Sequence, residues 1–205
     1  MNKALLALAP LVLAVPLLAQ TAPAELPGKA DPARVTAGTY ALDKTHTQVN
    51  WQVNHFGFND YFGLFGDITG TLTIDPANPS AAKVDVEIPI GSVATSSTGL
   101  TDHLKKTDFF DVAKFPTARF VSTGVTVDGS KAVIKGDLTM LGVTKPVELE
   151  TRFEGAGNNP FNKKATIGFH AATTIKRSDW GMNKYVPMVG DEVKLRISAA
   201  FEKAG

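Results

Sequence analysis

The feature that most constrains the fold is a two-residue alternation of apolar and polar side chains from residue 40 onwards. It is clearest near the carboxyl end, where residues 193–201 read V-K-L-R-I-S-A-A-F. Successive side chains of a strand point to opposite faces, so the pattern predicts strands with one buried and one wet face. The same alternation occurs in 46–56, 68–74, 84–90, 117–127, 131–140, 143–153 and 165–175.

These segments predict an all-β fold of about eight strands, which the short connections make antiparallel. Asp128-Gly129, for example, is a strong hairpin signal. Closing the sheet removes its exposed edges, so we expect an eight-stranded antiparallel barrel. A barrel of this size is either filled by side chains or holds one ligand. Small residues at inward positions (Gly70, Gly136 and Ala199) favour a cavity, although they are also compatible with bends at barrel corners.

Residues 54–65 read N-H-F-G-F-N-D-Y-F-G-L-F and include Phe56, Phe58, Tyr61, Phe62 and Phe65. From position 58 the aromatic spacing is i, i+3, i+4 and i+7, as on one helical face, but three nearby glycines interrupt it. We therefore expect one or two helical turns that break out of a strand. The rings either plug the core or line an apolar cavity, and both readings are open at this point.

Two further segments interrupt the strand pattern and account for one or two short helices. In 96–110 a Ser/Thr run can cap a short helix, which Leu100, Leu104 and Phe109 would dock on the barrel. In 177–190 the apolar residues include Trp180 and Tyr185 and follow no strand period. A long apolar loop is expected to cover something, here as a mobile lid or as a static cap.

The amino-terminal region indicates export. Residues 1–24 combine Lys3, an uncharged apolar run and small residues, which is typical of a signal peptide, and localisation in the periplasm is expected. Residues 25–38 are predicted to be a flexible leader, and 39–203 to form the barrel. Removal of residues 1–24 takes away Lys3 and no acidic residue, so the 21 basic residues become 20, equal to the 20 acidic ones. The sequence has no basic tract interleaved with aromatic residues, so no nucleic-acid partner is expected.

No motif for catalysis or metal binding is present. The four histidines form no H-x-x-x-H pair, the chain has no cysteine, and no G-x-S-x-G sequence occurs. His55 lies on an apolar strand face, either as a hydrogen-bonded core histidine or as a donor for a ligand headgroup. The basic residues Lys105, Lys106, Arg119 and Arg177 are either solvated or available to an anionic headgroup.

Several ordered motifs resemble those of the YceI-like family: Y-A-L-D-K-T-H (40–46), H-F-G-F-N-D-Y-F-G-L-F-G (55–66), H-L-K-K-T-D-F-F-D-V-A-K-F-P-T-A-R-F (103–120), G-D-L-T-M-L-G-V-T-K-P-V (136–147), R-S-D-W-G-M (177–182) and V-G-D-E-V (189–193). The resemblance implies a lipocalin-like barrel that binds polyisoprenoids or other long-chain lipids, in secreted bacterial proteins without established catalytic activity. Many relatives carry an acid two residues before the histidine of the D-x-H-L motif, where this chain has Thr101.

The expected function is therefore that of a periplasmic carrier that holds a polyisoprenoid, quinone-like or fatty-acid-like lipid and needs no other cofactor. The alternative is an enzyme that acts on such a lipid, with His55 or His103 as acid-base. A membrane or a membrane redox protein is expected as a transient partner. The expected ligand-binding residues are Trp51, His55, Phe56, Phe58, Tyr61, Phe62, Phe65, Leu104, Phe109, Phe120, Trp180 and Tyr185.

Overall fold

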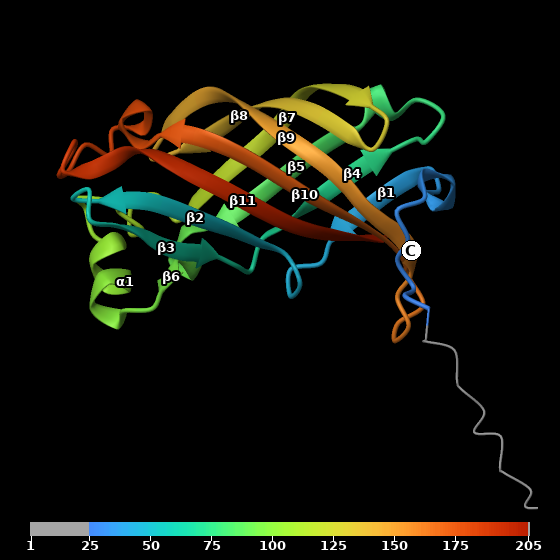
Figure 1. Cartoon of the computed structure of the whole chain (residues 1–205), viewed down its shortest axis with the longest axis horizontal. Helices are drawn as coiled ribbons and strands as arrows, with labels where there is room; N and C mark the ends of the chain where they lie inside the picture. The colour runs from blue at the N-terminus through green and yellow to red at the C-terminus, as the bar shows by residue number, and fades with distance from the viewer. Residues whose placement is uncertain (1–24, 205) are drawn as a thin grey trace, which may run out of the picture.

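A computed structural model describes residues 25–204, which form one sheet of antiparallel strands closed into a barrel (Figure 1). The predicted signal peptide, 1–24, lies outside the described residues. The strands are β1 (Gly38–Leu42), β2 (Gln48–His55), β3 (Asn59–Phe65), β4 (Thr69–Ile74), β5 (Lys83–Pro89), β6 (Ala94–Thr95), β7 (Thr117–Asp128), β8 (Lys131–Met140), β9 (Val143–Asn158), β10 (Ala165–Lys176) and β11 (Val189–Lys203). The helical elements are α1 (Thr98–Leu104) and the 3-10 turns η1 (Pro32–Arg34), η2 (Pro79–Ala81), η3 (Ile90–Ser92) and η4 (Arg177–Trp180).

The barrel closes as a ring of eight strands in the order β1, β4, β5, β7, β8, β9, β10 and β11, with β11 pairing back onto β1. The remaining three strands, β2, β3 and β6, pair in this order beyond β11. β11 pairs with β1 near its carboxyl end, at 201–203, and with β2 along 189–198. The strands β1 and β2 therefore lie one after the other along the same edge of β11. The prediction of an all-β, eight-stranded antiparallel barrel with a short helix is confirmed. No helix within residues 25–204 is long and apolar enough to cross a membrane.

The aromatic segment 54–65 is a β-hairpin, so the predicted helical turns are wrong. β2 and β3 pair from Val49↔Phe65 to His55↔Asn59. The turn between them places Phe56 at φ 56° and Gly57 at φ 74°. The helical spacing of the rings was coincidental, because β3 alternates in the strand period instead. Pairing across the hairpin satisfies the backbone donors and acceptors that a single helical turn would leave open.

The two ends of the barrel are closed differently (Figure 1). The helix α1 lies at one end, and η1 lies at the other, near the carboxyl terminus. We call these the α1 end and the η1 end.

The structure differs from the expected flexible leader, because residues 27–35 lie against the barrel. Lys29 exchanges backbone hydrogen bonds of 3.1 and 2.8 Å with Ala156. A Cβ on Gly157 would overlap the Pro27 carbonyl oxygen, so glycine permits this close approach.

The buried residues form two clusters, one toward each end. Ten buried residues, among them Trp51 and Phe120, make the cluster near the α1 end, and six, among them Tyr40 and Phe201, make the cluster near the η1 end. Gly136 does not enlarge an empty space, because a Cβ there would overlap the Phe120 ring. A Cβ on Gly63 would likewise overlap the Trp51 ring. These inward glycines therefore make room for aromatic rings.

Candidate functional site

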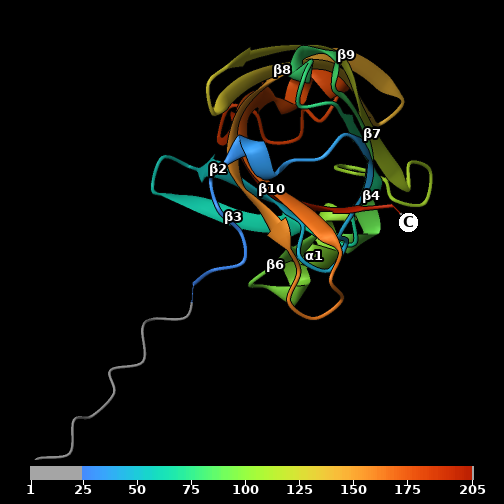
Figure 2. The same cartoon turned by 90° about the vertical axis from the view of Figure 1, so that its right-hand side faces the viewer.

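The interior of the barrel holds an apolar cavity of about 780 Å³. Figure 2, a view along the barrel, shows the strands arranged as a ring. Along β11 the lining positions run from Val189 to Phe201, roughly 40 Å of strand and, at the usual barrel tilt, roughly 30 Å along the axis. The volume lies within the range of about 300–1,000 Å³ typical of small-molecule sites. Its length suits an extended chain.

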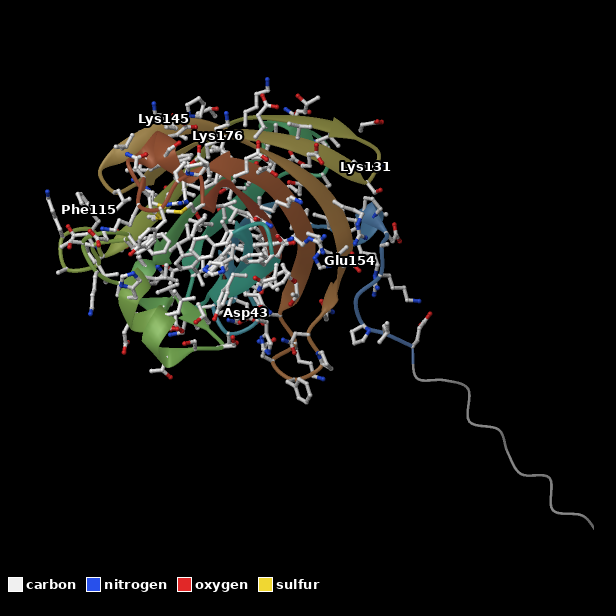
Figure 3. All side chains as sticks on the ribbon, turned by 60° about the vertical axis from the view of Figure 1, so that its left-hand side comes forward. Asp43, Phe115, Lys131, Lys145, Glu154 and Lys176 are labelled. Carbon is white, nitrogen blue, oxygen red and sulfur yellow. The ribbon has the colours of Figure 1, made fainter. Side chains whose placement is uncertain are left out.

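Alternation along each strand creates the apolar wall. In β10, for example, Ala171, Thr173 and Ile175 line the cavity, whereas Ala172 and Lys176 are exposed. Charged side chains occupy the outer face, from which Lys145, Lys176 and Glu154 project (Figure 3). The interior is thus a site for an apolar molecule.

Nine of the twelve predicted ligand-binding residues line the cavity: Trp51, His55, Phe56, Tyr61, Phe65, Leu104, Phe109, Phe120 and Tyr185. They come from β2, β3, β7, α1 and the loops at the α1 end. The remaining lining residues are mainly aliphatic side chains from strands all round the barrel, such as Val84, Leu149 and Ile197. The sequence analysis named only aromatic and motif residues. The alternation that predicted the strands was also the signal that would have found these aliphatic residues.

Phe58 and Phe62 do not line the cavity, contrary to prediction. Phe58, at the hairpin turn, is 90% exposed and Phe62 is 61% exposed. In β3 the inward residues are Tyr61, Gly63 and Phe65, so Phe62 falls on the outer face.

Trp180 also lies outside the cavity. It is 3% exposed in η4, and its indole Nε1 donates a 3.1 Å hydrogen bond to the carbonyl oxygen of Leu138 in β8. Trp180 therefore packs the loop 177–190 onto the barrel, an arrangement that favours the static cap over the lid. Tyr185 and Met188, farther along this loop, remain 43% and 57% exposed at the α1 end.

Arg177 lines the cavity, and its guanidinium also holds the same loop. It is 5% exposed and donates to the carbonyl oxygens of Met182, Val189 and Gly190 at 2.8, 3.0 and 2.9 Å. Burial lowers the pKa of Arg177, and the negative charge of Asp191 opposes that shift. Three of its five N–H donors bond backbone carbonyls, and these bonds join the two ends of the loop.

The other three basic residues considered for a headgroup, Lys105, Lys106 and Arg119, do not line the cavity. Arg119 forms a bidentate pair with Asp85, at 2.9 and 2.6 Å, which lowers the pKa of that carboxyl. Lys105 and Lys106 follow α1 and do not line the cavity. Of the four basic residues considered for a headgroup, only Arg177 belongs to the cavity lining.

Polar side chains collect instead at the α1 end of the cavity. His55, Tyr61, His103 and Tyr185 line it there. The His55 ring packs edge-on against Phe56 at 4.2 Å between centroids, and His103 packs against Phe109 at 4.9 Å. The apolar tail of a ligand can therefore occupy the barrel while these rings offer hydrogen bonds to a polar end. Among residues 25–204 no group of three or more His, Cys, Asp and Glu side chains could hold a metal ion.

Asp191 gives the loop 177–190 a pH dependence. Burial raises the pKa of Asp191, but hydrogen bonds from the Ser178 hydroxyl and N–H, at 2.7 and 2.9 Å, and the nearby Arg177 bring it below its ordinary value of 3.8. A carboxyl with a depressed folded-state pKa stabilises the fold above its unfolded pKa. This stabilisation disappears as the pH falls through the folded-state pKa.

We therefore expect Asp191→Asn to lower the free energy of unfolding at pH 7 and to have progressively less effect as the pH falls below about 4. Urea denaturation of both proteins from pH 7 to pH 3 measures the difference. Asp102→Asn, at an exposed position of α1, is the control. A difference for Asp191→Asn that is equal at pH 7 and pH 3 would contradict this account.

Comparison with known proteins agrees with the fold and with the motifs. The family model of the YceI-like domain matches residues 40–201. "Protein YceI" of Escherichia coli O6:H1 is 42% identical over 164 residues, which are 79% of this chain and 85% of that protein, and "Protein YceI" of Salmonella arizonae gives the same values.

Solved structures have the same fold. The Campylobacter jejuni YCEI protein superposes with a TM-score of 0.66 at 30% identity, covering 74% of this chain and 90% of that one. Burkholderia cenocepacia BcnA gives 0.69 at 23% identity, covering 78% and 98%. A polyisoprenoid binding domain from Saccharophagus degradans gives 0.61 at 15% identity, covering 80% and 98%. With the family match over most of the barrel, these likenesses show that the chain belongs to the YceI-like domain family.

Proposed function

We propose that this protein is a non-catalytic periplasmic carrier that holds one polyisoprenoid or similar long-chain lipid inside the barrel. The observation that carries the proposal is the apolar cavity of about 780 Å³ that reaches along the barrel. Removing a tail from water stabilises the complex by about 0.8 kcal/mol per buried CH₂, so a long chain supplies most of the affinity. The domain of similar fold from Saccharophagus degradans, described as polyisoprenoid binding, supports the same ligand class.

The polar end of the ligand is proposed to lie at the α1 end. His55, Tyr61, His103 and Tyr185 provide ring nitrogens and hydroxyls there. The η1 end of the cavity is lined by small residues and prolines, including Pro32, Ala33 and Pro76, and can hold the end of the tail. Transient contact with a membrane would supply or receive such a ligand.

Native mass spectrometry of protein purified from its own periplasm, without added lipid, tests the proposal. We expect one lipid per chain, recoverable by organic extraction and identifiable by its fragmentation. Amino-terminal sequencing of the same sample locates the signal-peptide cleavage site, which is expected between residues 20 and 25. Protein that carries no lipid and also fails to bind added polyprenyl alcohols would contradict the proposal.

A further inference from the structure

Exposed apolar side chains are concentrated at one end of the barrel. The large hydrophobic residues exposed among 25–204 are seven, and five of them lie at the α1 end: Phe56, Phe58, Phe62, Tyr185 and Met188. The other two, Leu26 and Phe161, belong to the η1 end and do not line the cavity. We call the five residues the α1-end patch.

The patch is held together by contacts between the hairpin and the loop 177–190. The Phe56 N–H donates a 2.8 Å hydrogen bond to the Met188 carbonyl oxygen. Tyr185 packs against Phe109, with 6.3 Å between ring centroids. Phe58 is held at the tip by the turn, where the Phe58 N–H donates to the His55 carbonyl oxygen at 3.1 Å. The side chains are thus displayed by ordered backbone.

Two residues of the patch connect the outer surface with the cavity. Phe56 and Tyr185 line the cavity and are also 45% and 43% exposed. A tail that leaves the barrel beside them remains in contact with apolar atoms. Each methylene exposed to water weakens binding roughly fourfold, so this path is favoured over one across a polar rim. At the η1 end the exposed apolar residues of the lining are smaller, namely Pro32, Ala33 and Pro76, and Gly129, Ser130 and Lys131 lie in the same rim.

The size and charge of the patch indicate its partner. From the exposed fractions its area is roughly 500–600 Å², because an aromatic side chain offers about 150–250 Å². A stable protein interface needs about 800 Å² per partner. The flanking charges are mixed, since Lys184 pairs with Asp108 at 3.3 Å and also lies 5.4 Å from the Tyr185 ring centroid. A small aromatic patch with a neighbouring lysine is suited to the interface of a lipid bilayer.

We propose that the α1-end patch inserts Phe58 and Phe62 into the interfacial region of a phospholipid bilayer and makes the α1 end the portal for lipid transfer. This inference rests on the proposed carrier function and names the surface that meets the membrane. Since Lys184 beside the patch is paired with Asp108, we expect the contact to need no anionic lipid.

The test uses the Phe58→Ser/Phe62→Ser double variant and, as a matched control, Phe161→Ser at the η1 end, where Phe161 is 93% exposed. Flotation with phosphatidylcholine vesicles measures bilayer binding. We expect the double variant to lose about tenfold or more in partitioning, and the control to change less than about twofold. Vesicles with added phosphatidylglycerol should give the same ranking.

Geranylgeraniol binding separates this inference from the carrier function. Its equilibrium affinity should be equal in all three proteins, because Phe58, Phe62 and Phe161 lie outside the cavity, whereas its transfer rate from vesicles should fall only in the double variant. If the unmodified protein does not bind geranylgeraniol, the carrier function fails. If it binds geranylgeraniol but the double variant floats equally well, the membrane contact is overturned. Self-association that the double variant abolishes, without flotation of the unmodified protein, would assign the patch to a second copy of the chain and would also overturn it.

Discussion

Replacing Ala171 by tryptophan is expected to reduce the affinity for a long-chain lipid by on the order of 100-fold or more, without loss of stability. Ala171 lies in β10, between Ile197 of β11 and Thr151 of β9, and its side chain lines the cavity. An indole there would fill the path of the tail and displace several methylenes. Displacement of three or four CH₂ groups at about 0.8 kcal/mol each gives roughly that loss.

Ala172→Trp is the matched control. Ala172 is the next residue of the same strand, but it is exposed on the outer face. Titration with geranylgeraniol and urea denaturation of both variants distinguish a blocked cavity from a damaged fold. If Ala171→Trp is as stable as the unmodified protein and still binds with unchanged affinity, the tail does not pass this level of the barrel.

Replacing Arg177 by methionine is expected to lower the free energy of unfolding by about 3–5 kcal/mol. The substitution removes a buried cation and leaves the carbonyl oxygens of Met182, Val189 and Gly190 without their donors. Each carbonyl was removed from water on folding, so the loss of several partners is more costly than the loss of one ordinary hydrogen bond. Urea denaturation monitored by circular dichroism measures the change.

Arg119→Met serves as the control, because Arg119 makes its ion pair with Asp85 at the exposed surface and only a small change is expected there. Hydrogen exchange localises the effect. In Arg177→Met, amides of 181–190 should exchange faster than in the control, because this side chain joins both ends of the loop. A loss of stability in Arg177→Met equal to that in Arg119→Met would show that the three hydrogen bonds do not stabilise the loop.

The sequence by itself determined the architecture. Alternation at period two is a local property that every strand must satisfy, and from it followed the strands, their buried faces and the eight-stranded barrel. The same rule would have placed Tyr61 and Phe65 inside and Phe62 outside. The helical spacing of the rings in 54–65 competed with it and led to the wrong prediction. Hairpin pairing between β2 and β3 resolved that competition, because it satisfies the backbone groups of both strands.

Only the tertiary structure decided which residues of different segments contact one another. Nothing near Arg177 in the sequence shows that it donates to carbonyls as far as Gly190, or that Trp180 bonds to Leu138 in β8. The reason for a glycine at position 136 is likewise the Phe120 ring, which a Cβ there would overlap. These contacts join residues far apart in the chain, and their donors and cavity walls exist only after the barrel has closed. Hydrophobic periodicity sets which face of a strand is buried, whereas closure of the barrel sets which side chains meet and which leave space for a ligand.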